Sequence, residues 1–484
     1  MQQLSQVLQS LPVDHPAKIG YQTWPCGDHI VNGLCFVNGP RSMRQLIISC
    51  FHKKDNPHFG SSEFLKFKDE VLTYDQAWQH ISALGAALVN DFGIRGGDRV
   101  AISMRNYPEW IIAFLAIMCV GGVVCPLNSL WKESEMEYGL ADSGTKVLFC
   151  DAERLVYAKS ALSKLQIPAI VCRGSGGSGG SGGATYTNTY TNVVGRRRGE
   201  TLPSYPSSLT IDSTAAIFYT SGSTGNPKGV CQTHRGMTNQ IYQPIALRML
   251  QGNSTPLKQQ AQQAIICPVP LFHVTGCHHL FLSALTSGSR LILMYKWDAG
   301  EALKLIERER PTSWTGVPTQ VQDLMEHPDF AKYDTSSLKR LGGGGAPTPV
   351  SQVEKVKNKF KGGGSAGNGY GLTETNGGIC TIFGDDYRKR PTSCGQPLPL
   401  VEVIVVIAGE QNTEDGSYKF IATPNTRGEL LIRSALVMKE YWNKPKKNQE
   451  SLVAVDIGKG GGWFRTGDIA ELDSENYIYI VDRL

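Results

Sequence analysis

Short apolar runs alternate with helix-forming segments through the first half of this chain, and this alternation restricts the folds open to it. Residues 99–103, 123–125, 146–150 and 169–172 are strand-like runs, several of them apolar on both faces. Helical segments lie between them. Strands that are buried on both faces and joined through helices are typical of a parallel sheet that is covered on both sides. The sequence therefore predicts an α/β fold.

The length of 484 residues exceeds what one compact core usually holds, so we expect two or three subdomains. Residues 427–433 and 477–482 are rich in strand and turn signals. We expect residues 1–67 to be an N-terminal extension that joins the core. Residues 68–400 should form the main α/β subdomains, and residues 401–484 a small β-rich subdomain that ends at a hinge.

One apolar stretch, residues 110–127, is nearly long enough to cross a bilayer. However, Gly121 and Gly122 interrupt the stretch and Pro126 closes it. The pattern favours a buried helix followed by a buried parallel strand. We therefore expect no integral membrane span.

The charge and the cysteine content limit which partners and which cellular compartment we expect. The chain has 48 basic and 43 acidic residues, and a net charge of +5 is too small to indicate a nucleic acid partner. The twelve cysteines include no Cys-x-x-Cys pair, and the N-terminus lacks the pattern of a secretory signal. Reduced thiols in a cytoplasmic or peroxisomal compartment are expected. The oligomeric state and any C-terminal targeting signal stay open.

Residues 174–183 are an unbroken run of glycine and serine. Such a run has no apolar anchor and behaves as a flexible coil. It is typical of an engineered linker that replaces a surface loop, and we infer no function from it.

The strongest local signal comes directly after a short strand at residues 215–218. The strand runs into Thr-Ser-Gly-Ser-Thr-Gly-Asn-Pro-Lys at residues 220–228. Glycines permit close backbone approach to phosphate oxygens, amide and hydroxyl groups donate hydrogen bonds, and Lys228 supplies positive charge. The spacing is not that of a Walker A loop. A solvated Ser/Gly loop would explain neither the strand nor the lysine, so we predict phosphate binding.

This loop resembles the signature loop of the adenylate-forming superfamily, which includes acyl-CoA synthetases, 4-coumarate–CoA ligases, firefly luciferase and the adenylation domains of peptide synthetases. Further segments resemble the other motifs of this superfamily, in the same order: residues 72–74, 110–128, 270–276, 344–347, 369–374 and 463–468. The resemblance extends from about residue 70 to the last residue. It implies a large N-terminal domain with two αβαβα sheets of parallel type packed together, plus a small β-rich subdomain.

The resemblance implies a role for individual residues. Tyr370 would stack on adenine, Thr373 would bind the α-phosphate, and Glu374 would hold Mg²⁺. Asp468 would accept two hydrogen bonds from the ribose diol, with Arg483 beside it. Taken alone, Tyr370 would by default be a core tyrosine, Glu374 a helix N-terminal charge and Asp468 part of an Asx-type turn. Arg483 could equally form a structural ion pair.

The expected site residues fall into four groups. The expected catalytic residues are Lys228, His273, Thr373 and Glu374. The expected nucleotide-binding residues are Thr220, Ser221, Gly222, Ser223, Thr224, Gly225, Lys228, Gly344, Gly345, Ala346, Pro347, Asn368, Gly369, Tyr370, Gly371, Thr373, Asp468 and Arg483. The acid is expected at His273, Gly276, Gly344, Gly369 and Gly377, and Mg²⁺ at Thr220 and Glu374. A lone histidine such as His273 could instead be a satisfied core residue.

The implied reaction joins a carboxylic acid to AMP from ATP and then transfers the acyl group to coenzyme A, the co-substrate. Residues 270–276 most resemble fatty-acyl-CoA synthetases, so a medium or long fatty acid is the first expectation. The alternatives are an aromatic acid of the coumarate type, a peptide-synthetase adenylation domain, a luciferase-like monooxygenase and a nucleotide-binding domain without activity. The chain stops where the superfamily's C-terminal lid domain begins, so weak turnover is expected.

Overall fold

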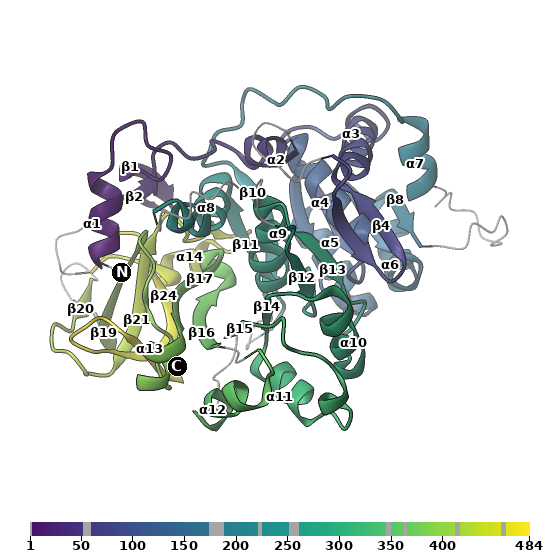
Figure 1. Cartoon of the computed structure of the whole chain (residues 1–484). Coiled ribbons are helices and arrows are strands. Elements are labelled where there is room, and N and C mark those ends of the chain that lie inside the picture. Colours follow the sequence, from purple (N-terminus) through teal and green to yellow (C-terminus); the bar gives the residue numbers. More distant parts are fainter. Residues whose placement is uncertain are drawn as a thin grey trace.

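Figure 1 shows the fold of the chain in a computed structural model. The structure describes residues 2–51, 60–173, 188–220, 225–250, 261–344, 350–362, 365–411, 417–455 and 461–484. The expected linker at residues 174–183 lies outside these ranges.

The first large sheet has eight strands within the described ranges, and it contains every strand that the alternating pattern predicts. The strand order is β22 (Glu440–Tyr441), β11 (Lys228–Thr233), β10 (Thr214–Thr220), β6 (Val123–Pro126), β5 (Arg99–Ser103), β7 (Val147–Asp151), β8 (Ala169–Cys172) and β9 (Asn188–Thr189). Neighbours from β10 to β9 are parallel, whereas β11 and β22 are added antiparallel. The connecting helices are α3 (Tyr74–Asn90), α4 (Pro108–Cys119), α5 (Glu133–Ser143), α6 (Ala152–Leu165) and α7 (Tyr190–Arg196). The predicted parallel sheet is confirmed.

The apolar stretch at residues 110–127 forms α4 and then β6, as predicted. Helix α4 is buried on all sides, and β6 lies inside the sheet between β5 and β10. Burial within the protein explains its uniform apolar character. No helix in the described ranges is both long and apolar enough to cross a bilayer.

The second large sheet has nine strands in the described part of the chain. The strand order is β18 (Gln396–Pro397), β17 (Gly377–Phe383), β16 (Ser365–Leu372), β15 (Arg340–Gly344), β14 (Ser313–Gly316), β12 (Ala264–Cys267), β13 (Arg290–Leu293), β3 (Glu63–Phe67) and β4 (Glu70–Thr73). Neighbours from β16 to β3 are parallel, and the strands at both edges are antiparallel. The helical segments are α8 (His234–Leu250), the π-helix η2 (Thr275–Leu282), α9 (Ser283–Ser287), α10 (Ala299–Glu309), α11 (Pro318–Glu326) and α12 (Val350–Lys359). Strands β3 and β4 pair across the boundary expected at residue 67.

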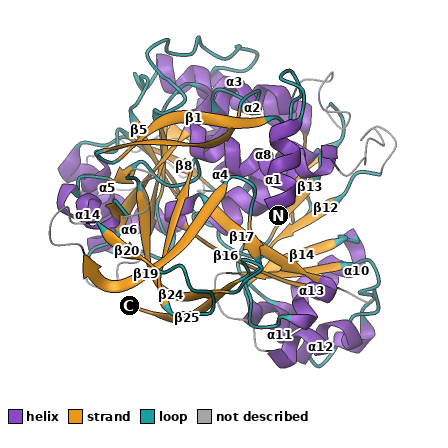
Figure 2. Ribbon diagram, turned by 90° about the vertical axis from the view of Figure 1, so that its left-hand side faces the viewer, coloured by secondary structure: helices purple, strands orange, loops and turns teal. Residues whose placement is uncertain are grey.

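The two large sheets share one apolar core. Side chains from α2 (Met43–Phe51), α3, α4, η2 and α9 form a continuous cluster that reaches strands of both sheets. Figure 2 shows helices packed around the strands of the two large sheets. The expected architecture of two packed α/β sheets is confirmed.

A third, antiparallel sheet forms the β-rich part. It contains β20 (Tyr418–Phe420), β19 (Val401–Gln411), β21 (Gly428–Ser434), β24 (Trp463–Leu472), β23 (Leu452–Val453) and β25 (Ile478–Arg483), with α14 (Pro445–Ser451) beside them. The N-terminal helix α1 (Gln2–Ser10) and the hairpin of β1 (Ile19–Cys26) and β2 (His29–Phe36) lie next to this sheet (Figure 1). Trp24 and Val31 of the hairpin pack into its core.

Candidate active site

The predicted phosphate loop connects two antiparallel strands, β10 and β11, which lie next to the edge strand β22 of the first large sheet. Thr220, the last residue of β10, is paired with Lys228, the first residue of β11. The Thr220 hydroxyl donates to the Lys228 carbonyl at 3.5 Å. The hairpin therefore fixes both ends of the loop, and Gly225, with φ of 143°, adopts a conformation that favours glycine.

The Lys228 ammonium lies over the ring of Tyr441, with Nζ 5.1 Å from the ring centroid. Burial lowers the pKa of Lys228, and the nearby positive charge of Lys447 adds to this effect. The carboxylate of Glu374 opposes it. A half-buried lysine with little direct charge compensation is suited to bind an anion.

Glycines shape the hairpin that presents Thr373 and Glu374. A Cβ atom on Gly371 of β16 would lie 2.1 Å from the Gly377 carbonyl oxygen, so only glycine permits this approach of the two strands. Between them, the 3₁₀ turn η4 (Thr373–Thr375) ends at Asn376, which has a left-handed backbone with φ of 57°. The turn places Thr373 and Glu374 at the end of β16.

The turn is tied to the first large sheet through Gln232 and Tyr441. Gln232 of β11 donates to the Thr373 carbonyl at 2.9 Å. The Tyr441 hydroxyl donates to Glu374 Oε1 at 2.7 Å. Burial and the Glu374 carboxylate raise the pKa of the Tyr441 phenol, so its hydroxyl is protonated and can donate. Lys228, Tyr441 and Glu374 thus form one cluster.

The expected adenine and ribose residues also meet. Tyr370 of β16 donates its hydroxyl to Asp468 Oδ2 of β24 at 2.5 Å. Asp468 is buried, and it faces Arg483 across the β24–β25 pair, with Oδ1 3.8 Å from the Arg483 Nε. Burial and the Asp468 carboxylate raise the pKa of Tyr370. This bond joins the second large sheet to the β-rich sheet.

Three further expected nucleotide-binding residues lie on β16 and the neighbouring strand β15. Gly344 of β15 is the parallel partner of Gly369 of β16, and a Cβ on Gly344 would lie 3.3 Å from the Gly369 carbonyl oxygen. Asn368 is buried, and its Oδ1 accepts a hydrogen bond from the Gly369 amide at 2.9 Å. Its side chain therefore supports the backbone here. Seven expected residues lie outside the described ranges: Ser221, Gly222, Ser223, Thr224, Gly345, Ala346 and Pro347.

Two of the expected acid-binding residues, Gly276 and Gly377, lie on η2 and β17, which contact each other. His273 precedes η2, and Gly344 and Gly369 lie on β15 and β16. A Cβ on Gly276 would lie 2.3 Å from the Pro270 carbonyl oxygen, so glycine is required where the π-helix begins. His273 is exposed, and its ring stacks obliquely on Phe272 with centroids 4.4 Å apart. No hydrogen bond among the described residues joins His273 to Thr373 or Glu374. Beside Gly378 of β17 the structure leaves space, since a Cβ there would meet no atom within 4 Å.

Comparison with known proteins identifies the family. The description "AMP-binding enzyme" matches residues 53–442, which is most of the chain. The chain belongs to the AMP-binding enzyme family.

Relatives in this family include CoA ligases of different substrate classes. A long-chain-fatty-acid–CoA ligase of Bacillus subtilis (strain 168) is 30% identical over 447 residues, which cover 88% of this chain and 74% of that protein. A feruloyl-CoA synthase of an Amycolatopsis species is 30% identical over 416 residues, which cover 86% of this chain and 74% of that protein. The crystal structure of the N-terminal domain of FACL13 from Mycobacterium tuberculosis has a TM-score of 0.71 at 25% identity, covering 92% of this chain and all of that one.

Sequence reasoning missed Tyr441 and Gln232 as members of this candidate site. Tyr441 lies 67 residues from Glu374, and Gln232 lies 141 residues from Thr373. The available signal was the aromatic pair Tyr441 and Trp442 just before a basic run, which is unusual for a purely solvated loop.

The residues present fit a magnesium ion held partly by a substrate. No described residue donates a hydrogen bond to the second carboxylate oxygen of Glu374. Mg²⁺ is commonly held by one or two carboxylates together with substrate phosphates. Within the described ranges, no group of three or more His, Cys, Asp or Glu side chains could enclose a metal ion by itself.

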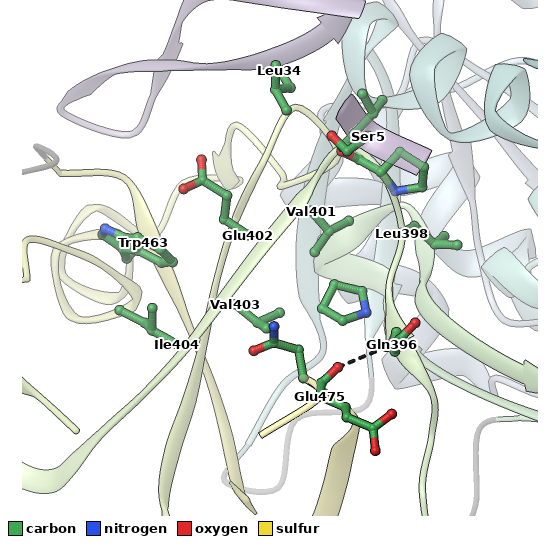
Figure 3. Close-up of a pocket in the computed structure, with 14 residues that line it drawn as sticks. Ser5, Leu34, Gln396, Leu398, Val401, Glu402, Val403, Ile404, Trp463 and Glu475 are labelled. Atoms are coloured by element: carbon green, nitrogen blue, oxygen red, sulfur yellow. Dashed lines mark hydrogen bonds between the residues drawn. The ribbon is translucent and has the colours of Figure 1, made fainter. Parts of the chain in front are cut away.

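A cavity of about 320 Å³ lies away from this cluster (Figure 3). It is lined by Ser5 of α1, Leu34 of β2 and residues 396–404, and the Gln396 amide donates to the Glu475 carbonyl at 2.8 Å. No expected site residue lines it, so we do not assign it to the active site.

Proposed function

We propose that this chain activates a carboxylic acid as its acyl-AMP, as the first half of an acid–thiol ligase reaction with coenzyme A. The observation that supports this most is the meeting of Lys228, Glu374 and the glycine-lined backbone of β16 at one edge, in a chain of the AMP-binding family. Its relatives are CoA ligases by name.

The proposed chemistry needs positioning and charge more than a covalent nucleophile. A carboxylate oxygen of the acid attacks the α-phosphorus of ATP, and pyrophosphate leaves with its bonding electron pair. The thiolate of coenzyme A then attacks the acyl carbon, and AMP leaves. Both steps build charge on phosphate or carbonyl oxygens, so fixed donors and cations lower their barriers.

Each cluster has a proposed role in this reaction. Lys228 places positive charge beside the phosphates, and the Thr373 hydroxyl binds the α-phosphate. Glu374 and Thr220 would hold a Mg²⁺ ion, which neutralises phosphate charge when bound. The Asp468 carboxylate accepts hydrogen bonds from the ribose diol, and this role requires it to exchange its Tyr370 contact for the nucleotide.

The proposed acid is a medium or long fatty acid. The support is the long-chain-fatty-acid–CoA ligase of Bacillus subtilis among its relatives, together with the apolar side chains Cys277, Leu280 and Phe281 that η2 places close to Gly276.

An aromatic acid with hydroxyl or methoxy groups is the second candidate. His278 of η2 is buried against Phe218, and neither ring nitrogen has a hydrogen-bond partner among the described residues. A polar substituent on the acid could satisfy this imidazole, whereas an alkyl chain could not.

The test is a single-turnover assay with enzyme in excess over ATP, across a panel of fatty and aromatic acids. Acyl-AMP and pyrophosphate should form together with one acid class, and Glu374→Gln should reduce the rate by about 10²-fold or more. Exposed Glu326→Gln is the matched control and should leave the rate unchanged. A folded protein that forms no acyl-AMP with any acid of the panel would contradict the proposal, and oxygen uptake would indicate a monooxygenase instead.

A further inference from the structure

We propose that Tyr441 is a positioning residue that fixes one carboxylate oxygen of Glu374 and keeps Lys228 from pairing with that carboxylate, so that both charges remain available to a nucleotide and its cation. This inference rests on the function proposed above. Nothing in the sequence motifs assigns a role to Tyr441.

The backbone around Tyr441 is held firmly on the edge of the first large sheet. Strand β22 pairs with β11, with Tyr441 opposite Val230. The Trp442 amide donates to the Gly229 carbonyl at 2.7 Å. The Asn448 side chain closes the other side, since its Oδ1 accepts from the Tyr441 amide at 2.7 Å and its Nδ2 donates to the Tyr441 carbonyl at 3.1 Å. The position of the ring is therefore built into the fold.

The Tyr441 side chain lies between two opposite charges. Its hydroxyl donates to Glu374 Oε1 at 2.7 Å, and its ring is 5.1 Å from Lys228 Nζ. The segment also holds the backbone of the glutamate, because the Met438 amide donates to the Glu374 carbonyl at 2.7 Å. Among the described residues, no ion pair joins Lys228 to Glu374.

The physical advantage lies in what the phenol prevents. A lysine and a glutamate in a half-buried site attract each other strongly, and a phosphate group would have to break that pair to bind Lys228. The phenol gives Glu374 a neutral hydrogen-bond donor and gives Lys228 an aromatic face. The hydroxyl and the aromatic face are weaker partners than an opposite charge. The phosphates can therefore bind Lys228, and the cation can bind Glu374, at a lower cost in free energy.

The test is a double-mutant cycle on the affinity for ATP in excess Mg²⁺, measured by calorimetry, with Tyr441→Phe, Glu374→Gln and the double variant. Y441F should weaken ATP binding about tenfold and raise the half-saturating free Mg²⁺ concentration by a similar factor. In the E374Q background the same change should have less than a twofold effect, because no carboxylate remains to be positioned.

Tyr190→Phe is the matched control. It removes another buried phenol, that of Tyr190 on α7, which is hydrogen-bonded to His80 at 2.9 Å. This change should not alter the affinity for ATP. Should Y441F fail to fold, Asn448→Ala displaces the same ring through its backbone, and its effect should also vanish in the E374Q background.

The outcomes separate this inference from the proposed function. Equal losses from Y441F with and without the Glu374 carboxylate would overturn the role of Tyr441, and so would unchanged affinity in both backgrounds. Absence of ATP binding by the folded wild-type protein would overturn the proposed function itself.

Discussion

Two buried histidines differ in how their ring nitrogens are satisfied. His234 receives a hydrogen bond from the Met43 amide at 3.3 Å and contacts the Tyr205 hydroxyl at 3.0 Å. His278 has no such partner in the described part of the chain. Burial lowers the pKa of His234 to about 4 and that of His278 to about 3. An unpaired polar group in this position costs roughly 1–3 kcal/mol, so His278 should weaken the free protein.

His278→Leu should therefore raise the free energy of unfolding by about 1–2 kcal/mol at pH 7. The wild-type histidine also binds a proton more readily when unfolded, near pH 6.5, than when folded. The free energy of unfolding of the wild-type protein should therefore fall as the pH drops below about 6.5, by roughly 2 kcal/mol at pH 5. Urea unfolding at pH 7 and pH 5 measures both effects. If H278L loses as much stability as the wild type between these pH values, the explanation is wrong.

The β16–β17 hairpin shows how one element sets the site geometry. Gly371 and Gly378 are partners across the two strands, but their surroundings differ. A Cβ on Gly371 would meet the Gly377 carbonyl oxygen at 2.1 Å, whereas a Cβ on Gly378 would meet nothing within 4 Å. The same methyl group is therefore excluded on one side of the pair and accommodated on the other.

Gly371→Ala should destabilise the protein by about 3 kcal/mol, because either the strands separate or the Thr373 turn shifts. Gly378→Ala should change stability by less than about 1 kcal/mol. It should instead raise the KM of the acid, since the methyl group would enter the open space beside β17. Thermal unfolding and the adenylation assay distinguish the two. Equal stability of both variants would contradict the assigned backbone contact.

The predictability of an element depended on its pattern. Strand β5 and helix α4 were predicted because continuous apolar runs mark them, and the greater length of the second run indicated a helix. The glycine-rich β16 was recognised as a motif but not as a strand, because it lacks the β-branched and apolar residues that signal one. The π-helix η2 was not predicted, since its geometry depends on the packing of Gly276 against Pro270, which no local pattern reveals.

At the scale of the whole molecule, the buried Arg235 joins three parts of the chain. It forms an ion pair with Asp212 at 2.6 Å, donates to Gln22 of the N-terminal hairpin at 2.7 Å, and lies 5.6 Å from the ring centroid of Trp24. These contacts hold α8 against the hairpin that packs on the β-rich sheet.

Arg235→Ala should therefore cost about 3 kcal/mol in the free energy of unfolding, because it leaves Asp212 and Gln22 without their partner. Arg427→Ala removes a pair with Glu471 at a similar distance of 2.7 Å, but Arg427 is 69% exposed. This control should cost less than about 1 kcal/mol. If both variants lose the same free energy of unfolding in urea, Arg235 does not hold α8 against the N-terminal hairpin as described.

The assembly of the site was only partly predictable at this scale. The motif order indicated which segments belong to the site, and Tyr370 and Asp468 do meet across 98 residues of sequence. The bond from Tyr441 to Glu374 depends on a two-residue strand docking at a sheet edge, and such a short pairing leaves no sequence period to detect.

The most direct test of the proposed acyl-adenylate site is calorimetric titration of the folded protein with an acyl-sulfamoyl adenosine, a stable mimic of acyl-AMP. We expect saturable binding at one site and at least tenfold weaker binding to Asp468→Ala. A folded protein that gives no saturable heat with this mimic would contradict the proposed site, because the clusters around Lys228, Glu374 and Asp468 would then not bind an acyl-adenylate.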